Sequence, residues 1–217
     1  MGGLLGLLLA SRQWTPVRRL VMNDIGAYVP LQALLAIARN LDAPERFTSI
    51  EEVEAHMRRT HREWGDIADE QWKAIARHGS RPDGDGFRLH YDPQIARLMH
   101  AVPVSPGLFS WGPWYRVRCP VLLLRGESSR IFPASVARAM LDSKANARLV
   151  EIPGCGHVPS LMAESHIAIV RDFLQGDAVR QEWQPPSYSY PGSSRMRTSS
   201  PRRSMRSARP PPAALPT

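Results

Sequence analysis

The alternation of strand-like and helix-like segments between residues 119 and 175 constrains the fold more than any other feature of this sequence. Residues 121–124 (VLLL) form a continuous apolar run, and residues 149–152 (LVEI) form a second strand-like run. Residues 134–141 and 164–174 follow these runs with the apolar spacing of amphipathic helices. Strands that alternate with helices pair in parallel, because each crossover is made by a helix that covers the sheet. The sequence therefore predicts an α/β fold.

Residues 1–29 add a helix and a strand to this pattern. Residues 1–11 (MGGLLGLLLAS) are apolar and rich in glycine. A secretory signal peptide requires a basic segment before its apolar run, and no basic residue precedes this one. An N-myristoylation pattern needs Ser or Thr at the position where Gly6 stands. We expect a short buried helix whose glycines permit close packing, followed by a buried strand at residues 18–23.

Residues 30–118 are predicted to be mostly helical. Leucines recur at helical spacing from residue 31 onwards, and Ser49 with Glu52 forms a capping box ahead of an apolar helix face. Residues 82–86 (PDGDG) predict a tight turn. We expect a helical cap inserted between two strands of the sheet. Four tryptophans of this region either line a substrate pocket or pack in the cap core: Trp64, Trp72, Trp111 and Trp114.

Residues 176–217 differ in kind from the rest of the chain. They contain eight of the 20 prolines, and their seven arginines and two acids supply +5 of the net charge of +8. Such a segment has too little apolar surface to offset the entropy of ordering, so we predict a disordered tail. Its arginines could contact nucleic acid or an anionic surface, but the tail has no recognisable binding motif, and we disfavour these partners.

Composition and residue spacing argue against a disulfide-rich protein, a membrane protein and a metal-binding protein. The two cysteines do not make a disulfide scaffold and fit a reducing, cytoplasmic environment. No apolar run reaches the roughly 20 residues of a membrane-spanning helix, so no membrane partner is expected. The seven histidines form no metal-ligand spacing with cysteines or carboxylates. We therefore expect neither a metal nor an organic cofactor.

Two motifs in their order along the chain resemble the C-terminal half of an α/β-hydrolase. They are CPVLLLRGESSRIFP and LVEIPGCGHVPSL, the second followed by a closing helix that ends in DFL. The resemblance implies that the first motif is the seventh strand and the turn of the catalytic acid. It also implies that Gly154 to His157 is the loop of the catalytic base. VMNDIGAYVP resembles the sixth strand leading into the cap, and MGGLLG resembles the tail of the nucleophile elbow. The expected fold is a partial one, made of the family's last three parallel strands and their helices.

The departures from that family concern its catalytic groups. The nucleophilic serine would stand one residue before Met1, and the first five strands and the His-Gly oxyanion loop have no counterpart in the chain. The acid position after the seventh strand reads Arg130. We expect a parent activity on small apolar ester-like substrates, a longer reading frame upstream of Met1, and a chain that is inactive as given. The alternative is a non-catalytic pseudoenzyme or a fragment from a mis-assigned gene.

Asp24 is the second candidate for the site, after His157. Some α/β-hydrolases, haloalkane dehalogenases among them, carry the acid after the sixth strand, where the resemblance places Asp24. An aspartate in this position can instead close the turn through an Asx hydrogen bond, and the sequence alone favours this structural role. The resemblance nevertheless makes His157, as base, and Asp24, as its acid, the two candidate catalytic residues. Ser128 and Ser129 are interpreted as turn formers.

Overall fold

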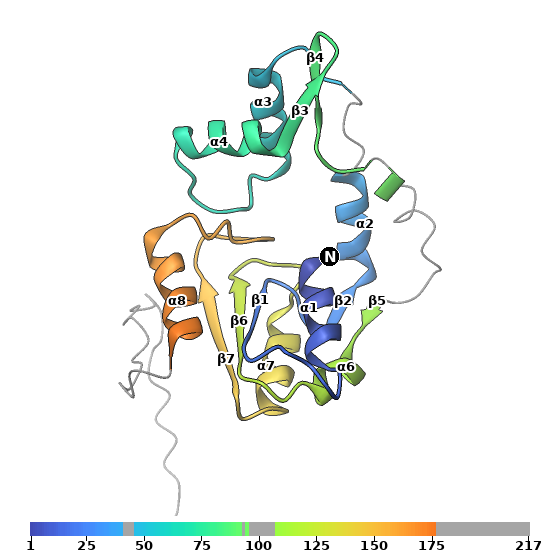
Figure 1. Cartoon of the computed structure of the whole chain (residues 1–217), viewed down its shortest axis with the longest axis vertical. Coiled ribbons are helices and arrows are strands. Elements are labelled where there is room, and N and C mark those ends of the chain that lie inside the picture. The colour runs from blue at the N-terminus through green and yellow to red at the C-terminus, as the bar shows by residue number, and fades with distance from the viewer. Residues whose placement is uncertain (41–45, 93, 96–106, 177–217) are drawn as a thin grey trace, which may run out of the picture. The chain divides into compact units, whose positions relative to one another are not determined.

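A computed structural model of the chain describes residues 1–40, 46–92, 94–95 and 107–176 (Figure 1). The predicted tail therefore lies outside the described residues except for Gly176. The elements are α1 Gly2–Ala10, β1 Leu20–Asn23, β2 Tyr28–Pro30, α2 Leu31–Asn40, α3 Ile50–Thr60, α4 Asp69–Gly79, β3 Ser80–Asp83, β4 Gly86–Leu89, β5 Gly107–Phe109, α6 Trp111–Arg116, β6 Val121–Gly126, α7 Ala134–Asp142, β7 Ala147–Ile152 and α8 Glu164–Gln175.

Strands β1, β6 and β7 form the parallel sheet that the sequence predicts. Their order is β1-β6-β7, with Leu20 opposite Val121 and Val121 opposite Ala147. All six residues of β6 are buried, which explains its uninterrupted apolar run. Because the strands are parallel, their carboxyl ends meet at one edge of the sheet, where the arrowheads of β6 and β7 lie side by side (Figure 1). The α/β fold class is confirmed.

The main core lies between this sheet and the helices packed on it. Its largest fully buried side chains include Trp114 from α6, Phe132 from the loop after β6 and Met140 from α7. The indole N–H of Trp114 donates to Ser143 Oγ at 2.9 Å, which satisfies its buried polar group. Trp114 therefore packs in the core and does not line a substrate pocket.

Helix α1 is only half buried, so the expectation of a buried helix is wrong in part. Leu7 and Ala10 are buried, whereas Leu5, Leu8 and Leu9 are exposed. The expected role of its glycines holds, because a Cβ at Gly3 would collide with the Ile25 side chain. The start of α1 thus lies directly against the loop that follows β1.

Residues 46–89, which we call the inserted unit, form a second core between β1 and β6 in the chain. Val53 and Met57 of α3 pack with Trp72 and Ala76 of α4, and Trp64 packs against them. Ser49 Oγ accepts the N–H of Glu52 as predicted, while the Glu52 carboxylate turns to Thr48. Hydrogen bonds from the backbone and hydroxyl of Thr48 lower the Glu52 pKa.

The region predicted to be mostly helical also contributes to two strand pairs that the sequence did not predict. The predicted turn is present, but it closes the antiparallel hairpin β3–β4, with Ser80 opposite Leu89. Strands β2 and β5 form a second antiparallel pair. In the chain, β2 precedes the inserted unit and β5 follows it. Pro82 argues against a strand in sequence terms, yet a two-stranded hairpin tolerates it because each of its strands is an edge. Among the described residues, no helix is both long and apolar enough to cross a membrane.

Candidate active site

Three loops at the carboxyl edge of the sheet bring Asp24, Ser129 and His157 together. Asp24 follows β1, Ser129 lies in the loop after β6, and His157 lies in the loop after β7. In parallel α/β sheets, ligands bind outside the carboxyl ends of the strands, so this edge is the expected place for a site.

Asp24 is fully buried and makes three side-chain contacts. Its Oδ1 accepts the N–H of Gly126 at 2.9 Å, and its Oδ2 accepts Ser129 Oγ at 2.6 Å. Oδ2 also lies 2.8 Å from His157 Nδ1. The backbone of Asp24 takes a left-handed conformation with φ of 54°, which aspartate tolerates better than most residues. The Asp24 carboxylate thus contacts residues at the end of β6 and in the loops after β6 and β7. It does not close a local Asx turn, which is the role that the sequence favours.

His157 is held through one ring nitrogen, and its side chain is partly exposed. An ionised carboxylate can only accept, so the contact with Asp24 assigns the proton to Nδ1 and leaves Nε2 as an acceptor. The side chain of His157 is 32% exposed, whereas Asp24 is entirely covered. The pair therefore presents an oriented imidazole nitrogen at the edge of the sheet.

Ser129, and not Arg130, is the residue of the β6 loop that faces the site. The N–H of Ser129 donates to the Gly126 carbonyl at 2.9 Å, and this turn directs its hydroxyl inward to Asp24. Arg130 is exposed. The expectation that Arg130 replaces the acid beside the histidine is therefore wrong by one position. The turn closed between Gly126 and Ser129 decides which side chain faces inward, and apolar patterning in the sequence does not reveal it.

The hydroxyl groups of the β6 loop and the thiol that precedes His157 are engaged elsewhere. Ser128 Oγ donates to the Cys155 carbonyl at 2.9 Å, and Ser129 Oγ donates to Asp24. Cys155 is buried, and burial together with the nearby Asp24 charge raises the pKa of its thiol. A thiol of raised pKa is a poor nucleophile, because the thiolate is the reactive form.

The loop that carries His157, residues 153–160, is held by the last residue of β1 and by the loop after β6. We call it the histidine loop. Asn23 Nδ2 donates to the Pro159 carbonyl at 3.0 Å, and the N–H of Ser128 donates to the Cys155 carbonyl at 2.9 Å. No side chain fits at Gly126, since its Cβ would collide with the carbonyl oxygen of Gly156. The end of β6 and the histidine loop therefore lie backbone against backbone.

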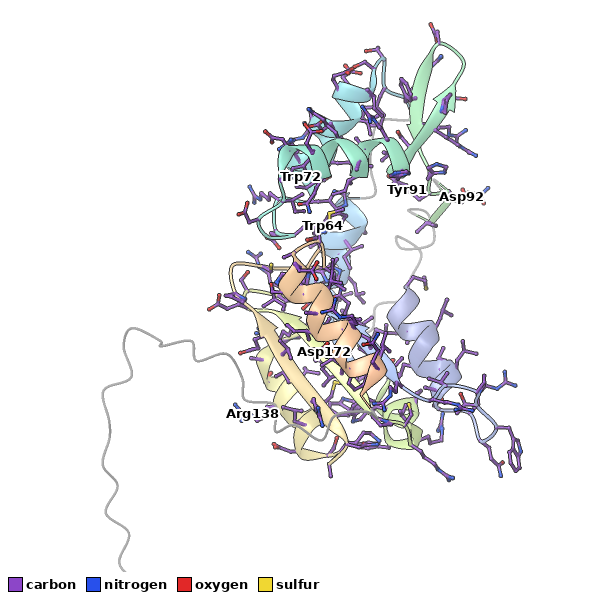
Figure 2. All side chains as sticks on the ribbon, turned by 60° about the vertical axis from the view of Figure 1, so that its left-hand side comes forward. Trp64, Trp72, Tyr91, Asp92, Arg138 and Asp172 are labelled. Carbon is purple, nitrogen blue, oxygen red and sulfur yellow. The ribbon has the colours of Figure 1, made fainter. Side chains whose placement is uncertain are left out.

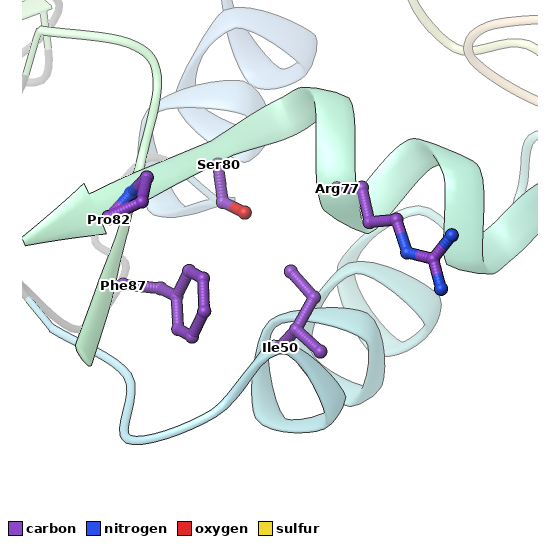
Figure 3. Close-up of a pocket in the computed structure, with 5 residues that line it drawn as sticks. All are labelled: Ile50, Arg77, Ser80, Pro82 and Phe87. Carbon is purple, nitrogen blue, oxygen red and sulfur yellow. The ribbon is translucent and has the colours of Figure 1, made fainter. Parts of the chain in front are cut away.

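Two cavities of the described residues lie away from this site. One, of about 270 Å³, lies within the inserted unit and is lined by Ile50, Arg77, Ser80, Pro82 and Phe87 (Figure 3). The other, of about 360 Å³, is lined by residues that follow α1 and by residues of and after α6: Ser11, Arg12, Gln13, Tyr115, Arg116 and Arg118. In the part of the chain that the structure describes, no three His, Cys, Asp or Glu residues form a group that could hold a metal ion.

Comparison with known proteins gives the family. The sequence model of the alpha/beta hydrolase family matches residues 1–173. The chain belongs to the alpha/beta hydrolase family. A 3-hydroxybutyrate-oligomer hydrolase of Cupriavidus necator is 32% identical over 184 residues, covering 81% of this chain and 63% of the relative.

Solved structures show the same α/β-hydrolase fold. An alpha/beta hydrolase from Novosphingobium aromaticivorans matches with a TM-score of 0.70 and 27% identity, covering 80% of this chain and 62% of that one. A Rickettsia typhi protein matches with a TM-score of 0.74 and 24% identity, covering 82% and 60%. The chain thus spans less than two thirds of the length of each of these proteins.

Proposed function

We propose that this chain supplies the acid–base part of a serine-type ester hydrolase, with His157 as general base and Asp24 as the carboxylate that orients it. The observation that carries the proposal is the 2.8 Å contact between the fully buried carboxylate of Asp24 and Nδ1 of His157. A carboxylate in this place fixes the imidazole tautomer and stabilises the imidazolium that forms during catalysis.

The geometry supports a defined set of proton transfers. Nε2 of His157 would take the proton of a serine hydroxyl as that oxygen attacks the ester carbonyl. The same nitrogen would then return the proton to the leaving alcohol, and the second half-reaction would repeat the sequence with water. Asp24 keeps its charge throughout, held by the Gly126 N–H and the Ser129 hydroxyl.

The nucleophile is assigned to the part of the family fold that this chain does not span. Helix α1 resembles the helix behind the nucleophile elbow, and its start packs through Gly3 on Ile25, the residue after Asp24. Figure 1 shows that α1 begins at the same edge of the sheet as the arrowheads of β6 and β7. A serine that precedes this helix would face the site, and the first helical N–H groups would serve a developing oxyanion.

We assign the substrate to short esters, and the inserted unit to a cap over the site. The relative from Cupriavidus necator is named for hydrolysis of 3-hydroxybutyrate oligomers, which are linear esters. Its 32% identity supports this class of substrate without fixing the acyl chain. The N–H of Gly156 in the histidine loop donates to the carbonyl of Glu63 in the inserted unit at 2.7 Å, which supports a role of this unit as a cap.

A chimera tests the proposal. The portion of the Cupriavidus relative outside the matched region is fused to residues 1–176 and assayed on 3-hydroxybutyrate oligomers and short p-nitrophenyl esters. We expect activity that His157→Ala abolishes and that Asp24→Asn reduces by about 10⁴ in turnover, because loss of the third triad member has such an effect. Arg130→Asp is the matched control and leaves turnover unchanged. An active chimera in which His157→Ala keeps full turnover would refute the assignment.

The second candidate is a non-catalytic role for the polypeptide on its own. The engagement of Ser128 and Ser129 in hydrogen bonds favours it, because neither hydroxyl is left to attack an ester. The two candidates concern different molecules, the completed fold and the chain as printed, so both can hold.

A further inference from the structure

The histidine loop is contacted by the inserted unit as well as by the sheet. The N–H of Gly156 donates to the Glu63 carbonyl at 2.7 Å, and the N–H of Ser160 donates to the Trp64 carbonyl at 3.3 Å. Cys155 Sγ lies 3.6 Å from the same Trp64 oxygen. These contacts flank His157 in the chain, on both its N-terminal and its C-terminal side.

The two backbones meet at positions where no side chain is tolerated. Gly65 has φ of 97°, and a Cβ on it would lie 2.5 Å from Cys155 Sγ. A Cβ on Gly156 would lie 2.6 Å from a carboxylate oxygen of Glu63. Both distances are far below a van der Waals contact, so the approach depends on glycine in both segments.

The turn that makes these contacts is anchored in the core of the inserted unit. Trp64, labelled in Figure 2, stacks on Trp72 of α4 with ring centroids 6.3 Å apart and planes within 10°. The His61 ring packs edge-on against Trp64 with centroids 4.2 Å apart. A displacement of Glu63–Gly65 would therefore disturb an aromatic cluster, which makes the turn a firm support for the histidine loop.

We propose that Glu63–Gly65 is a positioning element for His157, through which the inserted unit holds the base in register with Asp24. The proposal rests on the assignment of His157 as the base. The histidine loop is bonded to the end of β1 and the loop after β6, and also to this turn. Because Gly156 directly precedes His157, loss of the Glu63 contact lets the imidazole turn away from the carboxylate. A cap that shifts when substrate enters would then change the orientation of the base.

The test is the tautomer of His157 in the full chain, read from its imidazole ¹⁵N chemical shifts by NMR. We expect the unmodified chain to show Nδ1–H, and Gly65→Ala to lose this signature while the amides of β6 stay protected. Gly84→Ala is the matched control, because Gly84 also has positive φ, of 62°, but meets only the flexible side chain of Arg46. The double variant Gly65→Ala/Cys155→Ala removes the colliding sulfur but not the backbone strain at φ of 97°, and is expected to restore the signature in part.

A second measurement needs no variant and stands if Gly65→Ala does not fold. The Gly156 amide is expected to be protected from hydrogen exchange and to exchange together with the amides of α3 and α4 in mild denaturant. A Gly156 amide that exchanges as fast as an exposed one, or a Gly65→Ala chain with an unchanged His157 tautomer, overturns the proposal. Neither readout uses activity, so failure of this contact is distinguished from failure of the proposed function, which the chimera tests by turnover.

Discussion

Ser129 and Arg130 are neighbours with opposite environments, and the same substitution is predicted to act differently at each. Ser129→Asp places a second carboxylate against buried Asp24, and an unpaired buried charge costs about 3–5 kcal/mol. Arg130→Asp changes an exposed residue and should stay within about 0.5 kcal/mol. Urea unfolding near neutral pH measures both free energies. The Ser129→Asp loss should shrink in acid, where one carboxyl is protonated; an equal effect at both positions would contradict this geometry.

The side chains of the site show where prediction from sequence stops. The loop motif is enough to place His157 after a strand, since a Gly-x-Gly-His run is read directly from the chain. The direction of Asp24 is not readable in this way, because it depends on a left-handed backbone and on donors from two distant loops. The one-position error at Arg130 has the same origin. A turn of a few residues sets which side chain faces inward, and apolar patterning carries no information about it.

At the scale of single elements, two histidines, one in α3 and one that caps its C-terminus, should make the stability of the inserted unit depend on pH. Burial lowers the pKa of His56, with Arg59 and His61 adding to the effect, and burial also lowers the pKa of His61. Below the ordinary pKa of about 6.5, the unfolded chain binds protons that the folded histidines do not. The free energy of unfolding should therefore fall as the pH drops through about 6.5, until the folded histidines protonate as well.

The measurement compares urea unfolding, followed by circular dichroism, at about pH 7.5 and about pH 5. His56→Gln removes one of the two groups and should reduce the difference between the two pH values. His78→Gln is the control, because His78 is exposed on α4. A stability that does not change between the two pH values would show that the histidines of α3 protonate freely in the folded chain.

The elements themselves were predictable to different degrees. Strands β1, β6 and β7 and helices α7 and α8 follow from strong local patterns, namely continuous apolar runs and helical spacing. The hairpin β3–β4 was missed because its strands have four residues each and Pro82 lies within one of them. The pair β2–β5 was missed because three-residue strands separated by more than 70 residues have no local signature.

At the scale of the whole molecule, the exposed side of α1 and the free side of β1 predict self-association. Leu5, Leu8 and Leu9 of α1 are 53%, 43% and 51% exposed. Strand β1 is an edge of the parallel sheet in the described residues. Exposed apolar side chains on one helix and an unpaired strand edge are each typical of association sites. Sedimentation velocity should therefore show a mass that increases with concentration.

Leu5→Gln/Leu9→Gln should reduce this association without unfolding the chain, because Leu7 and Ala10 keep the buried side of α1 in place. Leu174→Gln is the control, since Leu174 is 51% exposed on α8, a different element. A monomer at every concentration, or an equal effect of the control, would show that the leucines of α1 are not the contact surface.

The chain as printed is expected to hydrolyse short p-nitrophenyl esters no faster than its own His157→Ala variant. Acyl transfer needs a nucleophile, a base and oxyanion donors held together. The structure provides the oriented base, but the Ser129 hydroxyl donates to Asp24, the Ser128 hydroxyl donates to the Cys155 carbonyl, and the pKa of the Cys155 thiol is raised. For the same reason a fluorophosphonate should not label the chain. Stoichiometric labelling that maps to a single serine would show that the polypeptide carries its own nucleophile, and the division of the site between two parts of the fold would then be wrong.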